Sequence, residues 1–235
     1  MYEWRTRIRY SETGTDGILT IAGLINLFQD TSNFESEDKN IGLTWLTRQR
    51  IGWIILKWQV DIKRMPALGE EVILGTSPYD FKTAFAMRNF FMKDASGEVI
   101  ACADSMWLQI NLDTLKPIPI TEEFASYYTV EEKYPMNYTR GKILPVSDER
   151  KENSIIIGHE HLDSNNHVNN GQYISMALHY ADNTRKLNRF MVEYRNQAFL
   201  GDVLIPYVSE NDTSTAVSFR NKEDVPFAVM IFCYE

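Results

Sequence analysis

The sequence predicts an α+β fold made of two similar lobes, each an antiparallel sheet wrapped around one long helix. Three observations support this. A helical pattern is followed by several strand-like runs, this order occurs twice, and one short string of residues recurs at a fixed register. The chain has 235 residues, of which 44% are hydrophobic and 24% are charged, as expected for an ordinary globular protein with room for two small lobes.

The first lobe begins with an alternating strand. Between residues 4 and 10, Trp4 and Ile8 lie on one face, and Arg5, Arg7 and Arg9 lie on the other. Apolar residues at helical spacing follow, and then alternating runs. We expect a helix at about 21–32, strands at 51–63, 71–78, 83–93 and 99–111, and a hairpin turn at 94–97.

The second lobe repeats this order after a connector that is broken by prolines. We divide the chain into an N-terminal lobe (1–120), a connector (121–150) and a C-terminal lobe (151–235). In the second lobe we expect a strand at 154–161, a helix at about 174–181, and strands at 190–197, 203–209, 216–219 and 225–234.

A recurring string supports the duplication. Val60-Asp-Ile-Lys-Arg-Met-Pro-Ala-Leu68-Gly69-Glu70 matches Val192-Glu-Tyr-Arg-Asn-Gln-Ala-Phe-Leu200-Gly201-Asp202. In both, a valine, an acid, an apolar residue and a base precede Leu-Gly-acid at the same spacing. In each half the string follows the helix and precedes the remaining strands, which is the element order of the hotdog fold. Two such units in one chain would form a tandem, or double, hotdog.

Composition excludes several classes of function. A net charge of −8 argues against broad nucleic-acid binding, which needs a basic surface. Cys102 and Cys233 are far apart in sequence and form no disulfide framework, which fits a reducing cytosol. The N-terminus has no apolar leader, and no apolar run approaches the roughly 20 residues of a membrane span. We therefore expect a cytoplasmic protein.

The segment 163–170 is the strongest candidate for chemistry. It is rich in Asn and Asp and directly precedes the second helical pattern, so it should be a loop at a helix N-terminus. Such a loop can offer unpaired N–H groups and the positive end of the helix dipole to an oxyanion. A simple helix cap is the alternative, but one cap cannot use so many polar side chains. The loop also contains both Asp163 and His167.

Three strings resemble the acyl-acyl-carrier-protein thioesterases of plant plastids and bacteria. They are Asp163-x-Asn165-x-His167-Val-Asn-Asn170-x-x-Tyr173, Trp107-x-x-x-Asn111-x-Asp113-Thr114 and Glu193-Tyr194-Arg195. The resemblance implies a double hotdog that hydrolyses the thioester between a fatty acyl chain and acyl carrier protein. It also implies that Asp163, Asn165 and His167 are catalytic.

The chain departs from this family a few residues after Tyr194. The family has a Glu there, sometimes followed by Cys, whereas this chain has Gln197 and Ala198. A cysteine nucleophile is therefore absent at this position, and an amide cannot act as a general base. We expect Asp163 or His167 to activate a water molecule, with Asn165 and Gln197 positioning the water and polarising the carbonyl.

Other features have weaker functional interpretations. His159 and His161 could face the same side of a strand and suggest a metal site, but no third ligand stands at a recognisable spacing, so we expect no metal and no cofactor. Two basic groups could bind an acidic carrier, although solvated faces are the default explanation. These groups are Arg5, Arg7 and Arg9, and Arg185, Lys186 and Arg189.

Three functions remain open. The leading one is an acyl carrier protein thioesterase whose partner is the acylated carrier. The others are a coenzyme A thioesterase and an acyl-binding protein without hydrolytic activity, which the amide of Gln197 would favour. A homodimer is compatible with the sequence, although two lobes within one chain reduce the need for it.

Overall fold

The structure, a computed structural model, describes residues 1–139, 141–163 and 166–235. Its contacts divide the chain into two compact units. The first contains Met1–Leu56 and Ile62–Tyr138, and the second contains Lys57–Asp61 and Thr139–Glu235. The division into lobes 1–120 and 151–235 with a connector at 121–150 stays a prediction; the boundary at Tyr138 falls inside that expected connector.

The first unit is built on an antiparallel sheet with the strand order β1-β3-β4-β5-β2. Each strand predicted between residues 51 and 111 is present. β3 extends beyond the predicted 71–78, because a register shift between Pro78 and Asp80 lets the strand continue past the proline. The strands are β1 (Tyr2–Arg7), β2 (Ile51–Ile62), β3 (Glu71–Lys82), β4 (Phe85–Asp94) and β5 (Val99–Asn111).

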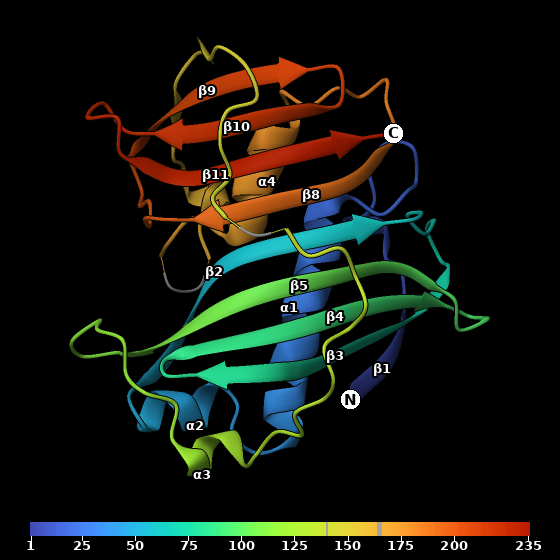
Figure 1. Cartoon of the computed structure of the whole chain (residues 1–235), viewed down its shortest axis with the longest axis vertical. Coiled ribbons are helices and arrows are strands. Elements are labelled where there is room, and N and C mark those ends of the chain that lie inside the picture. Colours follow the sequence, from blue (N-terminus) through green and yellow to red (C-terminus); the bar gives the residue numbers. More distant parts are fainter. Residues whose placement is uncertain (140, 164–165) are drawn as a thin grey trace. The chain divides into compact units, whose positions relative to one another are not determined.

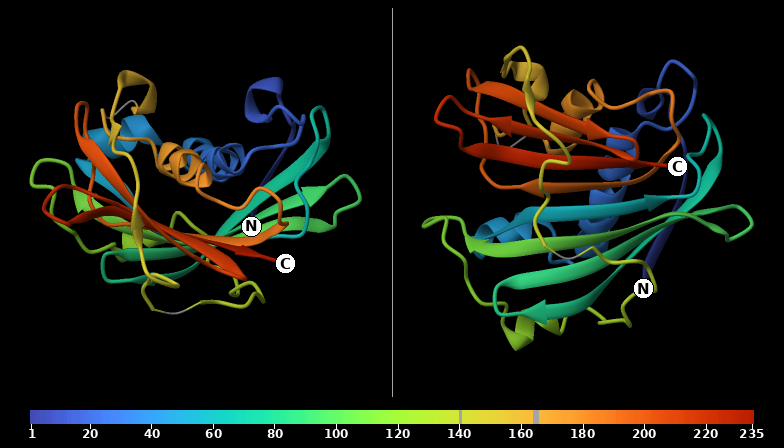
Figure 2. Two further views of the ribbon diagram at one scale, coloured as in Figure 1. Left: turned by 90° about the horizontal axis from the view of Figure 1, so that it is seen from above. Right: turned by 45° about the horizontal axis from the view of Figure 1, so that its top comes forward.

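One long helix, α1 (Ile21–Asp38), lies on one face of this sheet (Figures 1 and 2). The Thr20 hydroxyl caps it by accepting the Gly23 N–H at 3.0 Å. Leu24 and Phe28 are fully buried, and the Phe28 ring packs against Phe90 of β4 at a centroid distance of 5.4 Å. The helix is longer than the predicted 21–32. Its last two turns continue the buried face with the polar residue Glu35, which an apolar pattern cannot reveal.

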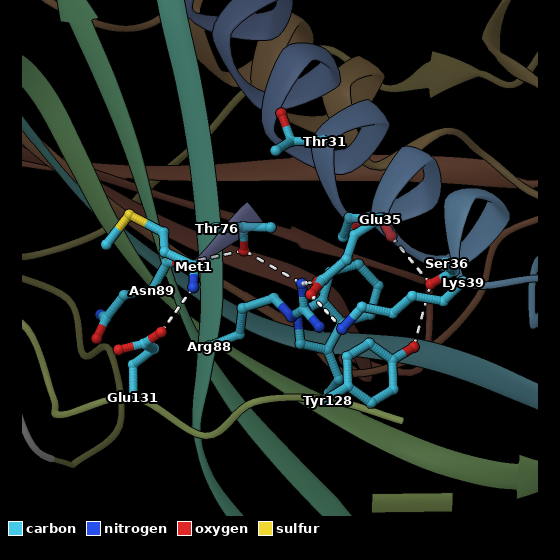
Figure 3. Close-up of polar contacts among 12 residues, drawn as sticks. Met1, Thr31, Glu35, Ser36, Lys39, Thr76, Arg88, Asn89, Tyr128 and Glu131 are labelled. Carbon is cyan, nitrogen blue, oxygen red and sulfur yellow. Dashed lines mark hydrogen bonds and ion pairs between the residues drawn. The ribbon is translucent and has the colours of Figure 1, made fainter. Parts of the chain in front are cut away.

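A buried ion pair joins the C-terminal half of α1 to the sheet (Figure 3). The Glu35 carboxylate pairs with the Arg88 guanidinium of β4, and these residues are only 3% and 8% exposed. Lys39 forms a second ion pair with Glu35 at 2.9 Å, and its ammonium lies 4.5 Å from the centre of the Tyr128 ring. Arg88 also donates to the Thr76 hydroxyl at 3.2 Å. The charges are therefore withdrawn from water but paired with one another.

After β5 the chain packs along the first unit rather than leaving it. The short helix α3 (Glu122–Ala125) buries Phe124 against Trp45 of helix α2 (Leu43–Arg48), with ring centroids 6.1 Å apart. The following segment then crosses the face of the sheet opposite α1 (Figure 1). There the Tyr134 N–H donates to the Asn89 side-chain oxygen at 3.0 Å. The Tyr134 ring packs against the Phe91 ring, with centroids 4.6 Å apart.

The second unit repeats this arrangement with a shorter helix. Its strand order is β2-β8-β11-β10-β9-β6, where β2 contributes Lys57–Asp61, and β7 pairs separately with β9. Helix α4 (Asn170–Leu178) lies on one face of this sheet (Figures 1 and 2). The strands are β6 (Arg150–Lys151), β7 (Ile155–Ile156), β8 (Leu187–Tyr194), β9 (Val203–Asn211), β10 (Ser214–Arg220) and β11 (Pro226–Tyr234).

Two boundaries in this unit differ from the prediction. The expected strand 154–161 is β7 alone, and its last residues form a 3-10 helix, η2 (His159–His161). The helix expected at about 174–181 begins earlier, because Asn169 caps its N-terminus, and it ends at Leu178. Each unit is an antiparallel sheet with one principal helix. The α+β class and the tandem hotdog are therefore confirmed.

The recurring string forms the same turn in both units. Gly69 and Gly201 adopt left-handed φ angles of 79° and 85°, which glycine adopts without a steric penalty. The Gly69 N–H donates to the Ile8 carbonyl and the Gly201 N–H to the Ile157 carbonyl, each at 2.9 Å. The duplication inferred from this string is thus a duplication of backbone geometry.

Two further findings bear on the expected setting of the protein. Neither cysteine forms a disulfide: Cys102 is buried and Cys233 is partly buried. Within the described residues, no helix is both long and apolar enough to cross a membrane.

Candidate active site

The segment between η2 and α4 is a tight loop closed by its own backbone. The Asp163 N–H donates to the His167 carbonyl at 2.8 Å, and the Asn166 N–H donates to the Asp163 carbonyl at 3.1 Å. Asn166 adopts a left-handed φ of 61°, a conformation that asparagine tolerates better than most residues. Asn and Asp are therefore needed in part to form the turn itself.

The Asp163 side chain also holds this loop. Its carboxylate accepts the backbone N–H of His167 at 3.2 Å. A charged acceptor makes this a stronger hydrogen bond than a neutral one would. Asp163 is thus placed to fix the backbone from which the His167 side chain projects.

Asn169 caps α4 and occupies much of its N-terminus. Its side-chain oxygen accepts the Gly171 N–H at 2.8 Å, and its carbonyl accepts the Gln172 N–H at 2.9 Å and the Tyr173 N–H at 3.4 Å. The expectation of unpaired N–H groups in this turn is wrong for these three residues, because the cap uses them. The positive end of the helix dipole remains beside the loop.

His167 is half-buried and lies beside the turn that contains the recurring string. The N–H of the next residue, Val168, donates to the Ala198 carbonyl at 3.0 Å, which ties the loop to that turn. The imidazole of His167 packs against the Phe199 ring, with centroids 5.0 Å apart and planes at 78°. Asp163, residues 166–168 and residues 198–199 therefore form one local site within the second unit.

The remaining predicted site residues have different outcomes. Gln197 is exposed and directly precedes the fully buried Ala198, so its backbone is adjacent to the loop. Asn165 lies outside the described residues. The structure thus places Asp163, His167 and the backbone of Gln197 in one neighbourhood. The catalytic roles of Asp163, Asn165, His167 and Gln197 stay predictions.

The first unit contains a second copy of this loop, which the sequence had not revealed. The Gly14 N–H donates to the Ile18 carbonyl at 2.9 Å, as Asp163 does to His167. The Leu19 N–H donates to the Pro66 carbonyl at 2.9 Å, as Val168 does to Ala198. Thr20 caps α1 as Asn169 caps α4.

Only the loop of the second unit carries titratable side chains at the two critical positions. Asp163 corresponds to Gly14 in the first-unit loop, and His167 corresponds to Ile18. Because the shared features are backbone hydrogen bonds, side-chain identity gave little sign of the second copy.

The other histidine and arginine groups favour structural interpretations. His159 and His161 lie in a 3-10 helix, so the predicted placement on one face of a strand is wrong. His161 accepts the Gly158 N–H through Nδ1 at 2.9 Å, while His159 is exposed. Within the described residues, no group of three or more His, Cys, Asp or Glu side chains could hold a metal ion.

The two basic groups are largely neutralised by acidic partners. Five of the six side chains form ion pairs, which weakens the case for either group as a docking surface for an acidic protein. The pairs are Arg7–Glu71 (2.6 Å), Arg9–Glu12 (3.5 Å), Arg185–Asp182 (3.7 Å), Lys186–Glu235 (2.7 Å) and Arg189–Asp61 (2.5 Å).

Two tyrosines behind the loop differ in how their hydroxyl groups are satisfied. Tyr194 donates to the Asn170 carbonyl at 2.9 Å. Tyr173 is 3% exposed, and its hydroxyl has no hydrogen-bond partner among the described residues. Burial raises the pKa of Tyr173, and the nearby backbone of Ala198 opposes part of this rise. The Tyr173 hydroxyl is thus buried at a cost that the Tyr194 hydroxyl avoids.

This difference predicts opposite effects of the same substitution. Tyr194→Phe should lower the free energy of unfolding by about 1 kcal/mol, because it removes a hydrogen bond. Tyr173→Phe should leave that free energy unchanged or raise it by up to about 1 kcal/mol, since no bond is lost. Urea denaturation of the two variants measures both values. Equal destabilisation by the two changes would show that the Tyr173 hydroxyl is satisfied.

Comparisons with known proteins agree with this fold. The family model for the acyl-ACP thioesterase N-terminal domain matches residues 1–128, more than half of the chain. A crystal structure of an acyl-ACP thioesterase from Bacteroides thetaiotaomicron aligns with a TM-score of 0.89 at 22% identity, covering 99% of this chain and 97% of that one. The 12:0-ACP thioesterase from Umbellularia californica aligns with a TM-score of 0.81 at 17% identity, covering 100% and 96%.

Curated relatives agree as well. A chloroplastic acyl-[acyl-carrier-protein] hydrolase of Cuphea viscosissima is 27% identical over 218 residues, covering 84% of this chain and 52% of its own length. A chloroplastic oleoyl-acyl carrier protein thioesterase of Arabidopsis thaliana is 25% identical over 240 residues, covering 92% and 65%. This chain thus spans about half to two thirds of the length of these relatives. From the match over residues 1–128, the chain belongs to the acyl-ACP thioesterase family.

Proposed function

We propose that the protein hydrolyses the thioester of fatty acyl-acyl carrier protein and releases a free fatty acid. The observation that carries this proposal is the loop that places Asp163 and His167 at the N-terminus of α4 and beside Ala198. Membership of the acyl-ACP thioesterase family supports the same reaction. The first-unit loop has neither side chain, so we assign one active site to each chain.

The proposed reaction uses water as the nucleophile. His167 accepts a proton from water while the water oxygen attacks the thioester carbonyl carbon, which forms a tetrahedral intermediate. The intermediate then collapses, the carbon–sulfur bond breaks, and the protonated His167 gives the proton to the leaving thiolate. The products are a fatty acid and the free thiol of the carrier. Asn165 and Gln197 would position the water and polarise the carbonyl.

Asp163 supports this reaction through the backbone. Its carboxylate accepts the His167 backbone N–H, so it holds the part of the loop from which the imidazole projects. If Asp163 itself accepted the proton from water, that hydrogen bond would weaken during the reaction. This favours His167 as the base and Asp163 as the residue that holds it in place.

Neither cysteine is placed to act as the nucleophile. Cys102 is buried in β5, and Ala198 occupies the position where the family sometimes has a cysteine. Burial raises the pKa of the Cys233 thiol, which lowers the fraction of reactive thiolate near neutral pH. A direct attack by water is therefore the mechanism best supported by the residues present.

One observation favours a different function, acyl binding without hydrolysis. Gln197 is exposed and cannot accept a proton, although the family has a carboxylate at this position. A protein that stores or senses acyl groups would not need that carboxylate. The second unit would then supply a loop that holds the thioester without activating water.

Release of free thiol separates these possibilities. We expect turnover of acyl carrier protein thioesters, with a kcat/KM above that for coenzyme A thioesters of the same acyl chain length. A higher kcat/KM for coenzyme A thioesters would mean that the substrate is acyl-coenzyme A rather than the acylated carrier protein. The reaction would still be thioester hydrolysis. Absence of thiol release from both carriers, tested over medium and long acyl chains, would contradict hydrolysis and favour the binding protein.

We also place the enzyme in the cytoplasm, with the acylated carrier as its macromolecular partner. The two cysteines form no disulfide, which is compatible with a reducing compartment. The carrier is acidic in this proposal, and an acidic protein would dock best on a surface with net positive charge. Arg7 on β1 and Arg189 on β8 offer it little such charge, because both are paired with carboxylates.

A further inference from the structure

A large aromatic side chain is exposed beside the candidate active site. Phe199 leaves 48% of its surface accessible, an unfavourable arrangement for a phenyl ring that could pack into a core. Its position is nevertheless well fixed. The Phe199 N–H donates to the Asp202 carboxylate at 2.8 Å, and the Asp202 N–H returns to the Phe199 carbonyl at 3.1 Å. A rigid turn therefore presents this ring.

The ring faces the imidazole of His167. Their centroids are 5.0 Å apart and their planes are nearly perpendicular, at 78°. The backbones beside them are tied together by the Val168–Ala198 hydrogen bond of 3.0 Å. Perpendicular packing of two rings between fixed backbones restricts rotation of the imidazole about its side-chain torsions.

The equivalent turn in the first unit shows that this pairing is not a requirement of the fold. Phe199 corresponds to Ala67, and His167 corresponds to Ile18. By contrast, Leu68 and Leu200 occupy the next position of both turns, and they are 49% and 50% exposed. An exposed leucine thus belongs to the shared turn, whereas the aromatic pair occurs only where the loop carries a titratable side chain.

We propose that Phe199 is a positioning residue that orients the His167 imidazole for proton transfer. This inference rests on the proposed function, because it assumes that His167 handles the proton. General acid–base catalysis needs the nitrogen within hydrogen-bonding reach of the water, and a small rotation of the ring would move it away. Phe199 meets this need by contact with the ring rather than by a hydrogen bond.

The turn offers a matched set of variants. Phe199→Ala removes the ring, Phe199→Tyr retains it, and Leu200→Ala removes a neighbouring side chain of similar exposure. With an acyl carrier thioester, Phe199→Ala should lower kcat by roughly 10-fold to 100-fold with little change in KM. Phe199→Tyr should recover most of this loss, and Leu200→Ala should remain close to the wild type. Equal kcat values for Phe199→Ala and Leu200→Ala would overturn the proposal.

A second measurement does not depend on turnover. NMR of labelled histidine side chains in the substrate-free protein reports the orientation and titration of the His167 ring. We expect its ring resonances to shift in Phe199→Ala and to stay in place in Leu200→Ala. Unchanged resonances in Phe199→Ala would refute the positioning role. If resonances shift but the wild-type protein hydrolyses no thioester, the positioning contact stands and the proposed function fails.

Discussion

Replacing His167 by alanine is expected to lower the kcat for acyl carrier thioester hydrolysis by about 100-fold to 10,000-fold, the usual contribution of general acid–base catalysis. The substitution removes the proposed base. It leaves the loop intact, because the N–H and carbonyl of residue 167 still bond to Asp163. The melting temperature should therefore stay close to that of the wild-type protein. Thiol release measured alongside thermal unfolding tests both expectations.

Two further variants make this result specific. His159→Ala changes an exposed histidine outside the loop and should keep wild-type activity. Asp163→Asn retains an oxygen that can accept the His167 N–H but cannot accept a proton, so we expect most of the activity to persist. Loss of activity in Asp163→Asn with full activity in His167→Ala would transfer the role of base to Asp163.

Breaking the buried ion pair of the first unit should have the largest effect on stability. Glu35→Leu leaves Arg88 buried without its carboxylate and also removes the partner of Lys39, so we expect a loss of about 3–5 kcal/mol. Arg88→Met should cost less, because Glu35 keeps its ion pair with Lys39 at 2.9 Å. Chemical denaturation of the two variants measures this difference.

The double variant and a surface pair provide the controls. Glu35→Leu combined with Arg88→Met should cost much less than the sum of the two changes, since no charge is left unpaired at position 88. The Arg7–Glu71 pair has side chains that are 73% and 60% exposed, and Glu71→Gln should cost less than about 1 kcal/mol. Equal costs for the buried and exposed changes would show that burial does not govern the Glu35 pair.

The strands and the duplication could be predicted from the sequence because they depend on side-chain patterns. Alternation in β1 places Trp4 inward and Arg5 outward, and the structure confirms this burial pattern. The Leu-Gly-acid string identifies a turn that only glycine forms easily, at Gly69 and Gly201. Patterns of this kind involve residues close together in the chain, so they can be recognised from the sequence alone.

Other features depend on partners that are distant in sequence. The basic residue Arg189 is paired with Asp61, which lies 128 positions earlier in the chain. The last turns of α1, beyond the predicted end at residue 32, contain Glu35, which pairs with Arg88 in β4. Neither pairing leaves a local pattern, so the sequence left a docking surface possible for the first residue and gave no sign of the second pair.

The candidate site was partly predictable for a similar reason. Asp163 and His167 belong to a recognisable motif, and their loop position follows from its Asn and Asp content. The contact between His167 and Phe199 depends instead on the Val168–Ala198 hydrogen bond, which joins two segments about thirty positions apart. Phe199 lies within the recurring string but is not one of the residues that the two copies share, so its proposed role follows only from the contact between these segments.

The most direct test of the central claim is thiol release from acyl carrier protein thioesters by wild-type and His167→Ala proteins under identical conditions. We predict that the wild type releases one equivalent of free thiol and one of fatty acid per substrate, and that His167→Ala is slower by about 100-fold or more. Equal rates for the two proteins, or no release by the wild type at any acyl chain length, would contradict the placement of the active site in this loop.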